Sequence, residues 1–355
     1  MLRAEDNTPA YWKALLQRES AALGFSLCGI AEAGPAPHAE LFLRWIAEKK
    51  HGSMDWLARR PDRRTDPRCV LPGAHSVIVL AHNYFAGNPP VQSARPGAFA
   101  RYAWGYDYHD DILRKLRVLQ DLLRPSGAAS RAYVDTGPVL ERDFATEAGV
   151  GWNGKSTVQI HPRLGTWFFL AVILTTLELP ADTPLPDRCG SCTRCIDACP
   201  TRAITATRRL DARRCLSYWT IEHRGTIPLE FRRPLGNRVF GCDDCLTVCP
   251  WNRFAQASHE SARQAREFVT HWNLADFLTL DEAAFRGLFH RSPVKRTKRS
   301  GFLRNVCIAL GNSGTPEDLP ALEAFAAQEP EWLAEHARWA VGEIEERHAL
   351  HRSGG

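Results

Sequence analysis

The sequence has 355 residues, of which 44% are hydrophobic, and a formal net charge of +5. This length allows two or three domains with at least one substantial core, and the composition excludes a disordered chain. The longest apolar run, from Trp167 to Thr176, is too short to span a bilayer, and no secretory signal pattern is present at the N-terminus. We therefore expect a soluble, cytoplasmic and monomeric protein with no membrane association.

Periodic patterns in the first half predict a mixture of helices and strands. Apolar residues at helical spacing predict a helix over residues 10–23, and Gly24 suits its C-terminal cap. Apolar runs then predict strands over residues 25–31 and 76–82, and a further strand that ends at Asp135. The N-terminal part is therefore predicted to be an α/β domain.

The stretch GVGWNGKS, residues 149–156, matches both the P-loop pattern and the glycine pattern of dinucleotide-binding folds. Both sites require a strand before the glycines and a helix after them, because the helix N-terminus supplies N–H groups to phosphate. Here a predicted helix over residues 139–148 comes first, and strand-like residues follow. We predict that this stretch does not bind ATP or NAD, although it stays a candidate surface for a polar cofactor group.

The remaining chain divides into two further parts. A Pro-rich linker at residues 179–187 precedes a cysteine-rich segment, and a helical pattern follows Asn252. Residues 303–312 align with residues 334–343 at an offset of 31, which favours paired helical repeats of the HEAT type over an ordinary helical bundle. The predicted fold class is multi-domain α+β, with an α/β domain (1–180), a ferredoxin-like module (181–255) and a helical HEAT-like domain (256–355).

Eight of the eleven cysteines lie between Cys189 and Cys249, and in a cytosolic chain this clustering indicates metal ligation rather than disulfides. The first run, C-x2-C-x2-C-x3-C-P from Cys189, is typical of bacterial ferredoxins with two [4Fe-4S] clusters, in which the fourth cysteine ligates the other cluster. The second run is stretched, because Cys215 stands alone before C-x2-C-x3-C-P from Cys242. The crossover rule predicts Cys189, Cys192, Cys195 and Cys249 as ligands of cluster one, and Cys199, Cys215, Cys242 and Cys245 as ligands of cluster two.

Other cysteine chemistry fits this spacing less well. Zinc sites also use C-x2-C pairs, but the x2-x2-x3-Pro spacing is not a zinc pattern. The C-x3-C-x2-C motif of radical S-adenosylmethionine enzymes is absent. We expect fully ligated clusters that carry electrons, and we expect the three remaining cysteines, Cys28, Cys69 and Cys307, to be core residues.

Two clusters in series imply a redox centre at one end, and the first domain is the place for it. This domain has no flavin or nicotinamide fingerprint. The cobalamin-binding motif D-x-H-x-x-G begins at Asp107-Tyr-His109, but Ile112 stands where the motif requires glycine. The residues alone therefore predict a two-cluster module that feeds electrons to a domain with an unidentified cofactor.

Beyond the cysteines, the chain resembles the epoxyqueuosine reductase family over nearly its whole length. The resemblance rests on HGSMDWLAR at 51–59, RYAWGYDYH at 101–109, YVDTGPVLER at 133–142, GVGWNGK at 149–155, both cysteine runs, GCDDC at 241–245, CPWN at 249–252 and SPVKRTKR at 292–299. It implies that the first domain binds cobalamin without a protein histidine as ligand. It further implies reduction of epoxyqueuosine to queuosine at the wobble position of tRNA, the last step of queuosine biosynthesis, with electrons passing through two [4Fe-4S] clusters to cobalamin.

The resemblance also implies partners and site residues. The partners are the tRNAs for Asp, Asn, His and Tyr, which carry a queuosine-type wobble base, and a low-potential electron donor such as ferredoxin or flavodoxin. Asp135 corresponds to the family's general acid, and we expect burial beside the corrin to raise its pKa well above the usual ~3.9. An Asp before Thr-Gly-Pro also starts turns, which is the alternative role. The further expected cofactor contacts are Arg59, Tyr102, Asn153, Ser156, Ser217 and Asp243.

Residues 291–304 carry six basic side chains and no acidic one. Charge runs are often only solvated surface, but two more arginine groups, residues 208–214 and 232–238, flank the cysteine module. We predict that Lys295, Arg296, Lys298 and Arg299 contact tRNA phosphates, with the flanking arginines as further contacts.

Two alternative functions remain open at this point. One is a reductive dehalogenase-like enzyme that uses cobalamin and the same clusters on a small organic substrate. The other is a plain electron-transfer ferredoxin with appended domains. The basic run and the helical repeats disfavour the first alternative, since a small substrate needs neither, and the second leaves Asp135 without a role.

Overall fold

The strands predicted in the first half form one sheet. The computed structural model describes residues 8–258, 260 and 263–353. Its largest sheet has the strand order β1-β2-β7-β4, and every pairing in it is antiparallel. The strands are β1 (Leu27–Glu32), β2 (Ser76–Asn83), β7 (Phe168–Thr175) and β4 (Ser130–Tyr133). The expected strands are confirmed, but this part is α/β only in the sense of mixed elements, because the sheet is not parallel.

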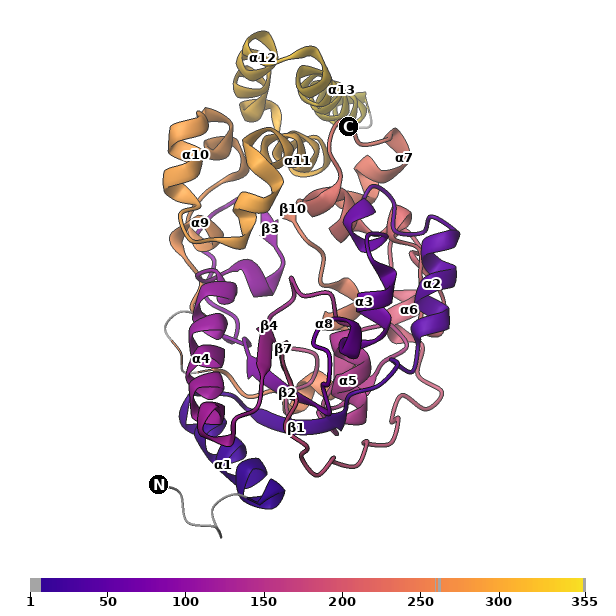
Figure 1. Cartoon of the computed structure of the whole chain (residues 1–355). Coiled ribbons are helices and arrows are strands. Elements are labelled where there is room, and N and C mark those ends of the chain that lie inside the picture. Colours follow the sequence, from indigo (N-terminus) through magenta and orange to yellow (C-terminus); the bar gives the residue numbers. More distant parts are fainter. Residues whose placement is uncertain (1–7, 259, 261–262, 354–355) are drawn as a thin grey trace.

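Helices cover both faces of this sheet (Figure 1). Side chains alternate along β2, so that Ile78 and Leu80 pack on one face while Val77 and Val79 pack on the other. The first face carries α1 (Pro9–Ala22) and α4 (Tyr108–Leu123), and the second carries α5 (Glu141–Glu147). The helices predicted over residues 10–23 and 139–148 are thereby confirmed. Two further helices, α2 (Ala39–Ala47) and α3 (Pro61–Thr65), lie between β1 and β2 in the chain.

The GVGWNGKS stretch is a short hairpin that follows a helix, as the sequence predicts. It contains β5 (Trp152–Asn153), which pairs with β6 (Gln159–Ile160), and α5 precedes it. No helix begins after its glycines, so it lacks the geometry of a phosphate-binding loop. Instead, Lys155 Nζ donates a hydrogen bond to the Gly190 carbonyl, and Arg208 N donates to the Lys155 carbonyl. The hairpin therefore holds the cysteine-rich segment against the sheet domain.

The cysteine-rich segment is built from short elements. They are α6 (Arg194–Asp197), β8 (Ile204–Ala206), β9 (Arg209–Leu210), α7 (Leu229–Arg232), β10 (Arg238–Phe240) and α8 (Asp244–Thr247). The helices α6 and α8, which contain Cys195 of the first run and Cys245 of the second, contact each other. Strand β10 pairs in parallel with β3 (Ala98–Phe99), so a segment of the first half reaches into this part.

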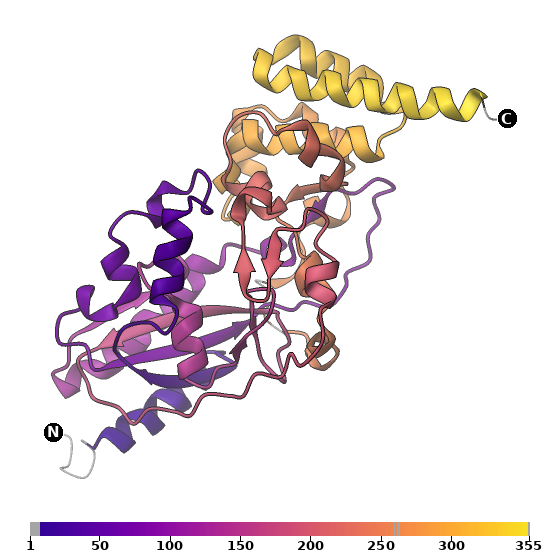
Figure 2. The ribbon, with the colours of Figure 1, turned by 90° about the vertical axis from the view of Figure 1, so that its right-hand side faces the viewer.

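The C-terminal part is helical. Its helices are α9 (Glu267–Thr270), α10 (Glu282–Leu288), α11 (Lys298–Ser313), α12 (Leu319–Gln328) and α13 (Glu331–Ser353). Both segments aligned at the offset of 31 lie in helices, α11 and α13, and these helices pack on each other. They touch where Gly311 allows a close approach, because a Cβ there would lie 2.6 Å from the Trp339 ring. Figure 2 shows these helices at the end of the molecule opposite the sheet, with the cysteine-rich segment between them.

One hydrophobic core joins parts that are far apart in the sequence. Phe99 of β3 packs against Phe268, Phe277 and Phe302, with ring centroids 5.2, 6.0 and 6.1 Å away. Val239 and Phe240 of β10 belong to the same core. The cysteine-rich segment and the C-terminal helices are therefore fixed to the sheet domain by shared burial rather than by a linker.

The three scattered cysteines differ in burial. Cys307 is fully buried and Cys28 packs against the core, as predicted. Cys69 is exposed, so the prediction is wrong there, because this residue ends a short surface turn, Pro67–Cys69. Within the described part of the chain, no helix combines the length and the apolar character that crossing a membrane requires.

Candidate active site and cluster ligands

The eight clustered cysteines gather in two groups, which we name group one and group two. Group one contains Cys189, Cys192, Cys195 and Cys249, and group two contains Cys199, Cys215, Cys242 and Cys245. Burial first, and then the charges of the other three thiols of group one, raise the pKa of Cys249 to about 11. Burial and the thiols of group two likewise raise the pKa of Cys245 well above its ordinary value. The fold thus brings the cysteines together in two groups of four, and these are the two ligand sets that the crossover rule predicts.

Group one lines a cavity of about 220 Å³ at the edge of the module. All four of its cysteines contribute to the lining, together with Lys155 and Ser156 of the GVGWNGKS hairpin and with Cys245 of group two. A cavity with four converging thiols suits an iron–sulfur cluster, since thiolates are the usual ligands of such clusters. Because Cys245 lines the same cavity, the two groups are direct neighbours.

Group two adjoins a buried apolar cluster, because Cys215 and Cys242 pack against the core that contains Trp219 and Ile308. Burial raises the pKa of Cys242 to about 12, so these thiols are neutral until a metal displaces their protons. Ala203 N donates a hydrogen bond to Cys199 Sγ at 3.1 Å, and Ser217 Oγ donates to the Cys242 carbonyl at 3.4 Å. Hydrogen bonds near cluster sulfurs are one of the means by which a protein tunes reduction potential.

Asp135 stands in a strained turn directly after β4. Its φ is +56°, a left-handed conformation that Asp tolerates better than most residues. Tyr108 Oη, at the start of α4, donates a hydrogen bond to Asp135 Oδ2 at 2.8 Å. His109 Nε2 lies 3.7 Å from the same oxygen, and His109 Nδ1 is 2.7 Å from Asp107 Oδ1. The Asp135 side chain itself is 66% exposed, so one face of the carboxyl group is open to a ligand.

The rise in the Asp135 pKa beside a bound corrin stays a prediction, and in the chain by itself the pKa of Asp135 is lowered. The protein around the carboxyl group shields it in part from water and raises this pKa, but the nearby His109 imidazole and the hydrogen bond from Tyr108 outweigh this effect and hold the pKa below its usual value. Burial alone would lower the pKa of His109, yet Asp107 and Asp135 raise it to about 9. The neighbouring Glu141 shows the opposite balance, because burial and the Asp135 charge raise its pKa well above normal. These directions favour a protonated His109 beside an ionised Asp135.

Tyr102 and Asp243 lie between Asp135 and group two. Burial raises the pKa of Tyr102 strongly, and the charges of Asp135 and Asp243 both add to this rise. Asp243 Oδ2 accepts a hydrogen bond from Arg101 N at 2.6 Å, and burial raises the Asp243 pKa to about 6. Since Asp243 is next to Cys242 in the chain, these residues connect the Asp135 turn to the inner cysteine group.

The other expected cofactor contacts lie around the hairpin and the 51–59 loop. Arg59 is exposed and Ser156 is buried beside group one. Asn153 Oδ1 is buried and has no hydrogen-bond partner among the described residues, and the same is true of His109 Nε2 and Arg64 Nε. Arg64 also reaches the turn after Asp135, where Nη1 donates to the Gly137 carbonyl at 3.4 Å. The unsatisfied atoms of His109 and Arg64 lie near the Asp135 turn, and unsatisfied buried polar atoms fit a ligand with many amide groups, such as a corrin.

Sequence reasoning missed Tyr108 and His109 as partners of Asp135. The only available signal was the incomplete D-x-H-x-x-G motif, whose histidine is His109. That motif points to a cobalt ligand, whereas here the imidazole lies between two carboxylates.

The side chains of the basic run, residues 291–304, differ in whether they are exposed to solvent or bound to other residues of the protein. Lys295 and Lys298 are exposed, and Arg296 forms a two-point ion pair with Glu222. Arg299 donates to the Leu280 carbonyl at 2.6 Å and pairs with Glu329, so it serves the fold. Most of the flanking arginines are also paired with carboxylates, namely Arg208, Arg213, Arg232, Arg233 and Arg238. The flanking groups therefore offer far less free charge than the sequence suggests.

Known proteins resemble this chain in its domains and over its whole length. The family described as 4Fe-4S double cluster binding domain matches residues 188–252, and the family described as Epoxyqueuosine reductase QueG, DUF1730, matches residues 64–136. Epoxyqueuosine reductase of Xanthomonas campestris pv. campestris is 41% identical over 330 residues, covering 90% of this chain and 92% of the relative. The enzyme of Escherichia coli K12 is 37% identical over 335 residues, covering 92% and 88%.

Solved structures give the same result. A crystal structure of epoxyqueuosine reductase with an epoxyqueuosine-modified tRNA-Tyr stem loop matches with a TM-score of 0.87 and 30% identity, covering 94% of this chain and 90% of that one. The epoxyqueuosine reductase of Streptococcus thermophilus matches with a TM-score of 0.87 and 27% identity, covering 94% and 90%.

Two adjoining groups of four thiols beside a carboxyl group in a polar turn place the protein among the iron–sulfur oxidoreductases. The match to the Xanthomonas campestris relative covers about nine tenths of both proteins, and the two family models match the ranges that contain the eight clustered cysteines and Asp135. This chain belongs to the epoxyqueuosine reductase family.

Proposed function

We propose that this protein reduces the epoxide of epoxyqueuosine in tRNA to the alkene of queuosine. The observation that carries this proposal is the match over nine tenths of both chains to a structure that holds an epoxyqueuosine-modified stem loop. A reductase for a small halogenated substrate has no comparable support. Because tRNA is the substrate, we place the reaction in the cytoplasm.

The cofactors follow from the family and from the donor sets. The cluster one ligands are Cys189, Cys192, Cys195 and Cys249, and the cluster two ligands are Cys199, Cys215, Cys242 and Cys245. Cobalamin, the family's other cofactor, supplies the two-electron reduction that opens the epoxide when it is bound. Arg59, Tyr102, Asn153, Ser156, Ser217 and Asp243 are the candidate residues that hold it, and the unsatisfied Asn153 Oδ1 supports this role most directly.

In this reaction the protein itself supplies a proton and a site that is shielded from water. Asp135 donates the proton to the epoxide oxygen, which finally leaves as water after a second proton and two electrons have been added. The exposed face of Asp135 is where a bound corrin would shield the carboxyl group from water, and this shielding would raise the pKa of Asp135. His109 stabilises the carboxylate that remains, and Tyr108 fixes the orientation of Oδ2.

The C-terminal part supports a nucleic-acid face. We assign residues 1–180 to cobalamin binding, 181–255 to the clusters and 256–355 to HEAT-like helices that bind tRNA, with the cores shared across these boundaries. Lys295 and Lys298 are exposed and have no ion-pair partner among the described residues. The pKa of Arg296 is raised by its pair with Glu222 and further by the charge of Asp135, so the run lies within electrostatic reach of the Asp135 site. An anticodon stem-loop held here by its phosphates would present an unstacked base to that site.

The proposal is tested with anaerobically reconstituted protein, added cobalamin, a low-potential reductant and epoxyqueuosine-containing tRNA. We expect mass spectrometry of the digested nucleosides to show queuosine. Asp135→Asn is expected to retain both clusters and cobalamin but to lower kcat about 10²–10⁴-fold, the usual contribution of a general acid. Asp110→Asn, a change of an exposed Asp on α4, is the matched control. No conversion by wild-type protein with spectroscopically intact cofactors would contradict the proposal.

A further inference from the structure

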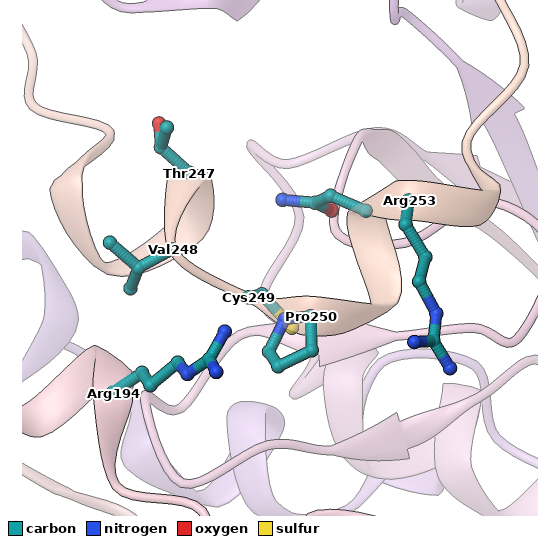
Figure 3. A pocket seen from close by; sticks show the side chains of 7 residues that line it. Arg194, Thr247, Val248, Cys249, Pro250 and Arg253 are labelled. Carbon is teal, nitrogen blue, oxygen red and sulfur yellow. The ribbon is translucent and has the colours of Figure 1, made fainter.

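An open cleft lies over group one on the outer side of the module. It has a volume of about 540 Å³ and is lined by Arg194, Thr247, Val248, Cys249, Pro250, Asn252 and Arg253. In Figure 3, Arg194 of α6 and Arg253 of the turn after Cys249 lie on either side of Cys249 and Pro250. This cleft shares Arg194, Cys249 and Arg253 with the smaller cavity that all the group one thiols line. A molecule seated in it would therefore lie beside group one, next to Cys249.

The charge of this surface has one sign. The lining residues of the two cavities include Lys155, Arg188, Arg194 and Arg253, and none of them is acidic. Arg188, Arg194 and Arg253 are exposed, and none of these three has an ion-pair partner among the described residues. Arginines elsewhere in the same segment, such as Arg208 and Arg238, do pair with carboxylates. Three exposed cations without an ion-pair partner among the described residues thus lie around group one.

The same surface carries an apolar anchor. Phe254 is 44% exposed, and the Arg253 guanidinium lies over its ring at 4.5 Å. Exposed Pro250 and half-buried Trp251 adjoin it. An aromatic and apolar centre with arginines around it is the composition of a protein–protein contact. A small reductant would need no such surface.

From these observations we infer that the surface formed by Lys155, Arg188, Arg194, Arg253 and Phe254 is the docking site of an acidic one-electron carrier protein, which delivers electrons to cluster one. The inference rests on the proposed function, because it gives the outer cluster the role of entry point. Two observations support it: the positive charge of the surface, which is complementary to an acidic protein, and the group one thiols that lie beneath the surface. The tRNA-binding residues proposed above lie outside both cavities.

In the proposed redox step, the carrier protein transfers one electron at a time to cluster one. In each encounter the reduced carrier loses one electron and cluster one gains it, so two encounters supply the two electrons that one epoxide consumes. Steering by opposite charges raises the rate of such encounters and makes it sensitive to salt.

The test uses the full-length protein with both clusters and, as probe, flavodoxin, a small acidic one-electron carrier. The double variant Arg194→Glu/Arg253→Glu is compared with Arg117→Glu, which reverses an exposed arginine on α4, remote from the cleft. Isothermal titration without tRNA measures the Kd for oxidised flavodoxin, and anaerobic stopped-flow absorbance measures cluster reduction. We expect the double variant to raise the Kd about tenfold or more at low salt and to flatten the salt dependence of the reduction rate. Reduction by methyl viologen, which needs no docking, should not slow.

Two results would overturn the inference. One is an unchanged flavodoxin Kd and reduction rate in the double variant. The other is a loss of tRNA affinity as large as the loss of flavodoxin affinity, which would make the surface a nucleic-acid contact. Iron content checks cluster assembly, and Arg194→Gln/Arg253→Gln gives the same test with a smaller effect if charge reversal impairs assembly. Since neither readout needs tRNA turnover, failure of the proposed function leaves this test intact.

Discussion

The two cysteine groups have the same ligands but opposite surroundings. Group one lines a cavity that opens to an arginine-rich surface, whereas group two lies against Asp243 and the route to Asp135. Sequence spacing treats the two halves as equivalent, but the fold leaves one half accessible and covers the other. If the proposed docking surface and the proposed role of Asp135 hold, electrons enter on one side of the module and the substrate is reduced on the other.

The contrast between the groups is tested most directly by removing one ligand from each. We expect Cys192→Ala and Cys245→Ala each to lower the iron content from about eight to about four atoms per chain, because each variant loses one four-iron cluster. Both should reduce turnover to background, since either gap interrupts the electron path. Cys245→Ala should also lower Tm more than Cys192→Ala, because group two adjoins a buried apolar cluster. Iron analysis and anaerobic thermal unfolding measure this, and Cys69→Ala at the exposed, scattered cysteine is the control.

A second prediction concerns the inner side, where His109 is charged beside two carboxylates. Its folded pKa is raised from 6.5 to about 9, so its pairing stabilises the fold fully below pH ~6.5 and is lost as pH rises through about 9. Each pKa unit corresponds to about 1.4 kcal/mol of stability. Because part of the His109 side chain is exposed, we expect the free energy of unfolding to fall by only about 1–3 kcal/mol over this pH range. His109→Gln should remove this dependence. Urea unfolding at several pH values measures it, and parallel wild-type and variant curves would contradict it.

The smallest expected effects concern the basic run, where exposed lysines can be compared with an arginine that is bound within the fold. Lys295→Ala/Lys298→Ala should weaken tRNA binding and reduce the slope of log K against log salt by about 1.4–1.8, because each phosphate that a lysine neutralises adds about 0.7–0.9 to that slope. Arg299→Ala should instead lower Tm, because it removes the partner of half-buried Glu329 and leaves that carboxylate unpaired. Filter binding and thermal unfolding distinguish the two. An Arg299→Ala variant with a normal Tm and a reduced salt slope would show that Arg299 contacts tRNA rather than stabilising the fold.

The parts of the site that could be predicted depend on local sequence. Cysteine spacing predicted both groups, including the crossover of Cys249, because ferredoxin-like turns fix ligand positions within a few residues. The hairpin at 149–156 was correctly separated from phosphate loops by the order of its neighbours. Tertiary contacts were not accessible in this way. The approach of His109 to Asp135 requires α4 to pack beside β4, and Arg299 finds Glu329 only through the fold of the C-terminal helices.

The pairing of β3 with β10 has a consequence for how the chain is made. Phe99 leaves the ribosome long before Val239, Phe268 and Phe302, the residues that bury it. Until those residues emerge, the β3 segment has neither its strand partner nor its core, so the first half waits with an apolar surface exposed. Synthesis that stops before the C-terminal helices should therefore yield an aggregation-prone fragment rather than a shorter working protein, and Asp135 and the inner cysteines reach their mutual positions only at the end of translation.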